Sequence, residues 1–408
     1  MTDERADAVT APRYLDRFRC VAAACEDTCC RGWNVAVDPA TLARWEAQLG
    51  AARVATTVDV DRRRLRLLPD GDCAQLDRDR LCGLHRELGE DALPDTCALF
   101  PRVLQQAGDR REATASLACP EIARLSLLAA DAHERVTLSP TPVLARAPHT
   151  LVSAADARAP WIARGPALRD AIDRALADPT WPIATRLAAV GRLGEVTRGR
   201  FHPDASLRDS ATLAAELDAA FTPATMAVVD AALYADAPAA FAGAAIVTDL
   251  LAARLAAPMS PTLRALMEAA LADTDAADGA VACGPRRLAP ARLWAAHDAR
   301  MAALPDHVLG RLDEIDVAWA RHVWRQRWHL FATDLFAHGL LHLVDRAIGR
   351  VLLAVHPGLA ADVDRAAVET IYLVTRHLEH AGLHPQLAAR LRAGGHENRA
   401  VARALILF

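Results

Sequence analysis

The chain has 408 residues, of which 52% are hydrophobic and 24% are charged, and its formal net charge is −4. These values are typical of a globular protein that is long enough for two domains or one large one. All 47 basic residues are arginine, and they form no basic block. A nucleic-acid partner is therefore disfavoured, because phosphate binding needs clustered positive charge.

The N-terminal segment, MTDERADAVTAPRY, is acidic and polar, without the basic and apolar regions of a signal peptide. The sequence also contains no run of about 18 apolar residues, which a membrane-spanning helix requires. We therefore expect a cytoplasmic protein that has no membrane partner. Thiols stay reduced in the cytoplasm, so dense cysteines indicate metal binding rather than disulfide bonds there.

The cysteines crowd into the first part of the chain, and the segment CVAAACEDTCCRGW (residues 20–33) holds four of them. Four thiolates suffice for one zinc ion or one iron–sulfur cluster. The spacing contains neither two CxxC pairs nor a CxxxCxxC motif, so it leaves both metals open. The candidate metal ligands are Cys20, Cys25, Cys29, Cys30, Cys73, Cys82, Cys97 and Cys119. The ninth cysteine, Cys283, lies in a Gly-Pro loop, and we expect no role for it.

Strand patterns occur around these cysteines. WNVAVD (residues 33–38) alternates and stops at a proline, which predicts a strand. CAQLDRDRLC (residues 73–82) reads as a hairpin whose two-residue turn sets Cys73 opposite Cys82, with their Cβ atoms about 5 Å apart. SLAC (residues 116–119) predicts a short strand, followed by a helix with Pro120 in its first turn. We therefore expect an α+β cysteine-rich metal-cluster domain over residues 1–135.

The tripeptide Asp-Thr-Cys occurs twice, at residues 27–29 and 95–97. Asp or Thr can cap a helix, which places each cysteine in a first turn, where the helix dipole favours a thiolate. We therefore favour Cys29 and Cys97 as ligands. On a helix Cys25 and Cys29 would also face the same way, while Cys30 would point about 100° away.

Prolines between residues 139 and 160 mark a boundary, after which the pattern is almost entirely helical. The prediction is a larger all-α domain over residues 150–408 with a loop break near 273–290, and hence a mainly α protein. Four large apolar residues recur at helical spacing and are expected to pack in the core: Trp324, Trp328, Phe331 and Leu335. His338 and His342 flank this stripe at i, i+4, and we interpret them as core or interface residues rather than metal ligands.

Another helix is predicted over residues 364–380, ending before Gly382 and Pro385. Its last turn, RHLEH, has many polar side chains directly after an apolar run. This face is either an exposed salt-bridged surface or part of a polar site.

Four stretches resemble the flagellin lysine-N-methylase family: FRCVAAACEDTCCRGWNVAVDPATLARW, LPDTCALFPR, LACPEIARL and IYLVTRHLEHAGLH. The first stretch is also similar to YkgJ-type cysteine-cluster proteins. The resemblance is strong over residues 13–125 and moderate over residues 315–385.

The resemblance implies a [4Fe–4S] cluster, S-adenosylmethionine as methyl donor, and lysine side chains of flagellin or another protein as acceptor. The sequence has no strand–GxGxG–helix unit, so its donor site would be unconventional. Methyl transfer also needs a neutral amine, and we predict Glu379, His380 and Arg376, together with His377, as the catalytic face that meets the cysteine domain. The alternative is a non-enzymatic iron–sulfur or zinc module that binds a protein partner.

Overall fold

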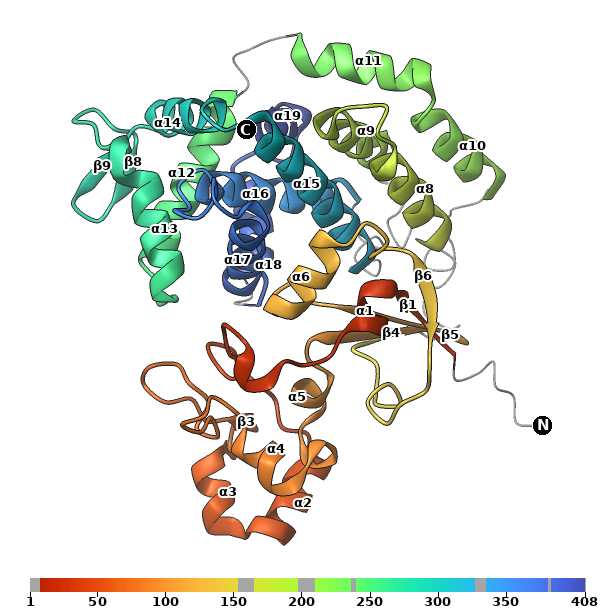
Figure 1. The fold of residues 1–408 in the computed structure, drawn as a ribbon, viewed down its shortest axis with the longest axis vertical. Helices are drawn as coiled ribbons and strands as arrows, with labels where there is room; N and C mark the ends of the chain where they lie inside the picture. Colours follow the sequence, from red (N-terminus) through yellow and green to blue (C-terminus); the bar gives the residue numbers. More distant parts are fainter. Residues whose placement is uncertain are drawn as a thin grey trace. The chain divides into compact units, whose positions relative to one another are not determined.

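The computed structural model describes residues 8–152, 165–196, 210–235, 240–326, 335–380 and 383–407. The chain divides into two compact units, one of Met1–Leu125 with Ala129–Leu151 and one of Ser126–Leu128 with Val152–Phe408. We call them the cysteine unit and the helical unit. Helices predominate among the described residues (Figure 1), which confirms the prediction of a mainly α protein. None of the described helices combines the length and the apolar character needed to cross a membrane.

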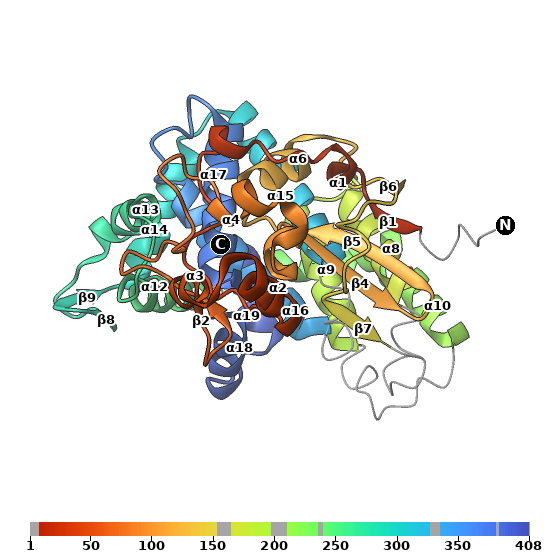
Figure 2. The same cartoon turned by 90° about the horizontal axis from the view of Figure 1, so that it is seen from below.

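The cysteine unit contains a five-stranded sheet in the order β6-β1-β5-β4-β7. Its first strand, β1, lies parallel to β5 and antiparallel to β6, while β4 and β5 form an antiparallel hairpin (Figure 2). The strands are β1 (Val9–Pro12), β4 (Arg102–Ala107), β5 (Arg110–Ala115), β6 (Arg135–Leu138) and β7 (Thr150–Val152). The N-terminal strand is thus held on both edges, by strands that lie much later in the sequence.

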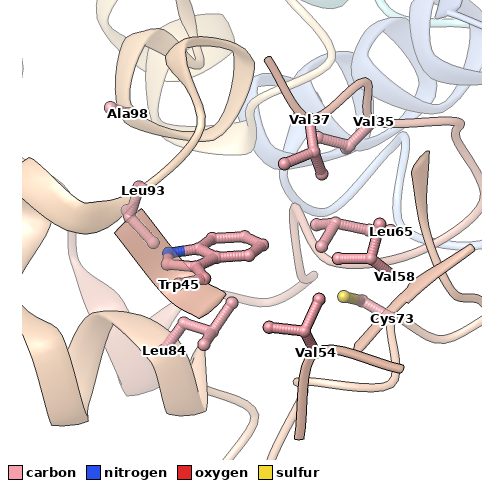
Figure 3. Packing of buried hydrophobic residues seen from close by; sticks show 10 residues of the cluster. All are labelled: Val35, Val37, Trp45, Val54, Val58, Leu65, Cys73, Leu84, Leu93 and Ala98. Carbon is pink, nitrogen blue, oxygen red and sulfur yellow. The ribbon is translucent and has the colours of Figure 1, made fainter. Parts of the chain in front are cut away.

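A lobe of short helices precedes β4 in this unit. Its elements are α1 (Arg13–Arg17), η1 (Ala22–Ala24), α2 (Pro39–Leu49), α3 (Ala51–Thr57), β2 (Val58–Asp59), β3 (Arg64–Leu65), α4 (Gly83–Leu88), η2 (Glu90–Ala92) and α5 (Asp95–Leu99), and α6 (Pro120–Leu128) follows β5. The indole of Trp45 is fully buried at the centre of the lobe, and its Nε1 donates a hydrogen bond of 2.8 Å to the Ala92 carbonyl. Figure 3 shows aliphatic side chains around this indole, with the Cys73 sulfur among them.

Two predicted strands of this unit are wrong. Residues 33–38 bury Val35 and Val37, but they make a single bridge, Ala36 to Arg64, instead of a ladder. Residues 116–119 form a turn, because β5 ends at Ala115 and the Ser116 hydroxyl accepts a hydrogen bond of 3.2 Å from the amide of Ala118. Pro120 begins helix α6, as predicted.

The described part of the helical unit consists mainly of helices. They are α8 (Gly165–Ala177), α9 (Ile183–Val196), α10 (Ser210–Ala220), α11 (Pro223–Tyr234), α12 (Ala240–Leu255), α13 (Pro261–Leu271), η4 (Ala272–Thr274), α14 (Pro290–Ala302), α15 (Asp306–Gln326), α16 (Leu335–Leu353), α17 (Val363–Thr375), η6 (Arg376–His380), α18 (Leu383–Ala393) and α19 (Arg399–Leu407). The predicted loop break contains a small hairpin, β8 (Val281–Cys283) with β9 (Arg286–Leu288), so the unit is not purely α. Cys283 lies on this hairpin.

Helices α15 and α16 pack closely through tryptophan, glycine and histidine. The Trp319 ring lies so near Gly349 that a Cβ there would be 2.9 Å from Cζ3, and a Cβ on Gly339 would be 3.3 Å from Cζ2 of Trp324. Each indole also meets a histidine of α16 edge to face. A side chain at position 349 would therefore force the indole of Trp319 to shift, whereas one at position 339 would be a tighter than usual contact with Trp324.

A buried ion pair joins the same two helices. The Asp316 carboxylate of α15 lies 2.8 Å from the Arg346 guanidinium and 3.0 Å from that of Arg350, both on α16. Arg346 also donates to the carbonyl of Ile406 in α19, at 3.2 Å. Burial opposes ionisation of Asp316, but the two arginines outweigh it, so the pKa of Asp316 is lowered.

The stripe of large apolar residues is described only in part. Trp324 and Leu335 are buried in the core, as predicted. Trp328 and Phe331 lie outside the described residues. His338 and His342 are buried on α16, in agreement with their interpretation as core residues.

Candidate metal centre

The loop that carries the first four cysteines is not helical, so the prediction that Cys25 and Cys29 share a helix face is wrong. Only the 3-10 turn η1 precedes Cys25. After it, the Asp27 carboxylate accepts a hydrogen bond of 2.7 Å from the Thr28 amide, and the Thr28 hydroxyl accepts one of 3.2 Å from the Cys30 amide. These side-chain bonds to the backbone form a turn in place of the predicted cap and helix.

Cys97 does lie in the first turn of a helix, α5, as the Asp-Thr-Cys pattern predicts. The N-cap residue is Pro94, however, so the helix has no side-chain cap at this position. Asp95 instead pairs with Arg146 at 2.7 Å.

The segments around Cys29 and Cys97 are linked by two aromatic residues. The Trp33 Nε1 donates a hydrogen bond of 2.7 Å to the Cys29 carbonyl. The indole of Trp33 also contacts the ring of Phe100, with centroids 5.2 Å apart. Phe100 directly follows α5, so this contact holds the two cysteine segments together.

The predicted pairing of Cys73 with Cys82 is also wrong. Cys82 forms a bridge with Leu76, and Cys73 forms one with Leu67. The shift arises from the turn, where the Asp77 carboxylate accepts hydrogen bonds from the amides of both Asp79 and Leu81. The turn is therefore longer than the predicted two residues, and the register changes with it.

Five thiols nevertheless gather in the lobe, and we call them the five-thiol group: Cys29, Cys30, Cys73, Cys82 and Cys97. Hydrogen bonds with the Cys29 and Cys82 sulfurs raise the pKa of Cys30, and the bond from Cys30 lowers the pKa of Cys82. Burial raises the pKa of Cys73, and the charges of Cys82 and Cys29 raise it further. Burial and the charges of neighbouring thiols likewise raise the pKa of Cys97.

The other three N-terminal cysteines form a second set, the three-thiol group of Cys20, Cys25 and Cys119. Burial raises the pKa of Cys25, to which the charge of Cys20 adds. Burial also raises the pKa of Cys119 to about 12, and the charges of Cys25 and Cys29 contribute. Cys29 therefore interacts with members of both groups.

The candidate ligands are all thiols, which are the donors that soft metal centres prefer. All nine cysteines are free thiols. In the part of the chain that the structure describes, no three His, Cys, Asp or Glu side chains are already arranged to hold a metal ion. Thiolates are the ligands of structural zinc and of iron–sulfur clusters. A bound cation would favour the thiolate forms, against the burial that raises the pKa of Cys73, Cys97, Cys25 and Cys119.

Charged side chains surround the three-thiol group. Glu26, in the loop between Cys25 and Cys29, pairs with Arg124 of α6 at 2.5 Å. Arg102, the first residue of β4, stacks over the ring of Phe18, with its guanidinium carbon 5.1 Å from the centroid. Sequence reasoning did not select Arg102, although it is the last residue of the LPDTCALFPR motif.

The predicted catalytic face lies on η6, a π-helical turn at the end of α17. His377 is partly buried, and its Nδ1 lies 3.1 Å from Nη2 of Arg254 in α12. Burial, with the charges of Arg254 and Arg376, lowers the pKa of His377 to about 4. The backbone of Glu379 and His380 is part of η6, but their side chains lie outside what the structure describes. The expectation that this face meets the cysteine unit remains a prediction.

The fold and the thiol groups together define a two-unit protein with a cysteine-rich centre in its first unit. The chain is 33% identical over 128 residues to a lysine-N-methylase of Salmonella typhimurium and 35% identical over 126 residues to one of Salmonella choleraesuis. It is also 33% identical over 128 residues to the flagellar biosynthetic protein FliU of Salmonella muenchen. Each match covers 28% of this chain.

The match spans 73% of FliU but only 31% of each lysine-N-methylase. The chain belongs to the flagellin lysine-N-methylase family, as its cysteine motifs predict. No family profile and no solved structure matches the chain.

Proposed function

We propose that this protein transfers methyl groups from S-adenosylmethionine to lysine side chains of flagellin or another protein, with a [4Fe–4S] cluster bound by the N-terminal thiols. The observation that carries the proposal is the gathering of free thiols in the unit whose motifs define the family. The names of the relatives, lysine-N-methylase and flagellar biosynthetic protein, support the acceptor.

The residues that would hold the cluster come from the five-thiol group, with Cys29 and Cys97 favoured. When bound, a cluster with an iron atom free of cysteine would supply a Lewis-acid position for the methyl donor. The three-thiol group and its charged neighbours would contribute to the site of the donor. Unit charges that are partly buried interact more strongly than exposed ones, so these neighbours affect what binds there.

The acceptor imposes a second requirement. A lysine Nζ attacks the methyl carbon with its lone pair while the bond between that carbon and the sulfonium sulfur breaks. The ammonium must therefore first give its proton to a base. Glu379 and His380 are the proposed bases on η6, and Arg376 is proposed to orient the carboxylate. His377 stays neutral at physiological pH, because burial and two arginines lower its pKa to about 4.

A zinc-stabilised module that binds a protein partner is the second candidate. The observation that favours it is the packing of the thiols against the hydrophobic core of the lobe, where Cys73 is 6% exposed. A structural metal contributes folding free energy from such a position.

The test is anaerobic purification of the full chain, followed by metal and sulfide analysis and incubation with flagellin and S-adenosylmethionine. Iron and sulfide in equal amounts, with methylated lysines detected by mass spectrometry, would support the proposal. Zinc without sulfide, and unmodified flagellin, would support the binding module instead.

A further inference from the structure

Arg102 is unusual among the arginines of the cysteine unit. It is half-buried, and it has no hydrogen-bond or ion-pair partner among the residues that the structure describes. Its guanidinium lies over the ring of Phe18, a residue that is only 3% exposed. A partly buried guanidinium is costly without an anion, because its donors are neither fully hydrated nor paired.

The surroundings of Arg102 are mixed in charge. Burial lowers its pKa, the charge of Arg19 lowers it further, and the charges of Glu90, Cys20 and Cys119 raise it. Arg19 itself donates to two backbone carbonyls, those of Asp16 at 2.9 Å and Phe18 at 2.7 Å. Two guanidiniums therefore repel each other beside the three-thiol group, and no carboxylate forms an ion pair with Arg102.

From this arrangement we infer that Arg102 is a specificity-determining residue, which receives the carboxylate of a small molecule bound beside Cys20 and Cys119. A guanidinium offers two parallel N–H donors, which match the two oxygens of a carboxylate. The nearby charge of Glu90 opposes a doubly charged phosphate more strongly than a singly charged carboxylate, and the Phe18 ring covers one side of the guanidinium at 5.1 Å. This inference rests on the proposed methyl donor, because S-adenosylmethionine carries such a carboxylate.

The experiment measures equilibrium binding to the anaerobically purified full chain, for S-adenosylmethionine and for its decarboxylated analogue. Arg102→Gln should weaken binding of S-adenosylmethionine by about 10- to 100-fold, the loss expected for a charged hydrogen bond. It should leave binding of the decarboxylated analogue unchanged. Arg102→Lys, which keeps the charge but loses the paired donors, should lie between Arg102→Gln and the wild type.

The matched control is Arg62→Gln in the turn between β2 and β3, where the arginine side chain is 79% exposed. It should bind both compounds like the wild type. Metal content and the thermal midpoint of each variant are measured alongside, so that unfolding is recognised. If folded Arg102→Gln binds S-adenosylmethionine like the wild type, the inference is overturned while the proposed function stands.

A second experiment tests the carboxylate site independently of the proposed methyl transfer. L-methionine and L-methionine amide, which lacks the carboxylate, are added to each variant, and the shift of the thermal midpoint is recorded. Stabilisation by methionine alone, lost in Arg102→Gln, supports the carboxylate site even if the wild type neither binds S-adenosylmethionine nor methylates flagellin. If methionine and the amide shift the wild type and Arg102→Gln alike, no carboxylate is recognised by Arg102.

Discussion

Cys29 is the thiol that interacts with members of both groups, and it is the most informative residue to change. Its side chain is exposed, so replacing sulfur by oxygen removes little packing. We expect Cys29→Ser to lower metal affinity by at least about tenfold, because even residues that only orient ligands contribute that much. Metal analysis after dialysis measures the loss. Cys283→Ser, in the helical unit, should retain the full metal content, and equal metal in both variants would rule Cys29 out as a ligand.

Glu379 is the residue on which the catalytic prediction depends. Removal of a positioned base lowers a rate by about 10²- to 10⁴-fold. Glu379→Gln should therefore reduce methyl transfer by that factor and leave the metal content unchanged. Glu268→Gln, at a glutamate of α13 whose side chain is 58% exposed, is the control. Wild-type rates in both Glu379→Gln and His380→Ala would indicate that RHLEH forms an exposed salt-bridged surface instead of a catalytic face.

At the scale of elements, glycines decide how closely the helices of the helical unit approach. A Cβ on Gly194 of α9 would lie 2.9 Å from backbone atoms of Phe336 in α16, which cannot move aside alone. Gly191 lies one turn earlier on α9, and a Cβ there would meet nothing within 4 Å. The two positions share a helix and differ in their neighbours.

Gly194→Ala should destabilise the protein by about 1–3 kcal/mol, because the strain of overpacking exceeds the gain in helix propensity. Gly191→Ala should stabilise it by about 0.5–1 kcal/mol, because alanine lowers the entropy of the unfolded chain. Urea denaturation compares the two. If both substitutions change stability in the same direction, the close approach of α9 and α16 does not determine the outcome.

At the scale of the whole molecule, the two units should respond differently to loss of metal. The lobe packs short helices around Trp45, with four of its thiols in or against this small core, whereas the helical unit has its own extensive core. Metal binding provides folding free energy in such lobes. Chelation should therefore remove a small part of the helical circular dichroism signal and leave a cooperative thermal transition. Loss of the whole signal in one step would show that the units share their stability.

Acid should weaken the helical unit through its buried histidines. Burial is the main reason that the pKa is lowered to about 3 for His297 and to about 4 for His342 and His377. The charges that act on His342 besides burial are those of Asp345, Arg346, Asp316 and His384. In the unfolded chain these imidazoles regain a pKa of about 6.5, so the unfolded state binds more protons at mildly acidic pH.

The part of the stability that depends on neutral histidines should thus be complete above about pH 6.5. It should decline as the pH falls towards about 4. Denaturation midpoints across this range measure the decline. His342→Leu removes one titrating group of similar volume, so its midpoint should fall less steeply with acid than that of the wild type. If the midpoints of the two proteins fall equally with acid, protonation of His342 does not contribute to the loss of stability.

The sequence alone determined the features that depend on local patterns. Helical spacing of apolar residues predicts a mainly α protein, and the cysteine motifs predict the family. Both are confirmed, since periodicity and residue identity are properties of neighbouring positions. Pro120 at the start of α6 and Cys97 in the first turn of α5 follow from the same local rules.

Only the tertiary structure decided the features that depend on competing hydrogen bonds and on distant neighbours. The pattern around Cys29 allows a helix, but bonds from Asp27 and Thr28 to the backbone close a turn first. Cys82 pairs with Leu76 because the Asp77 carboxylate lengthens its turn. Arg102 follows a proline in an unremarkable strand, and its half-burial arises only when folding brings Phe18 and Cys20 from the start of the chain against β4. Such environments are absent from any local window of sequence, because burial and charge are set by residues far apart along the chain.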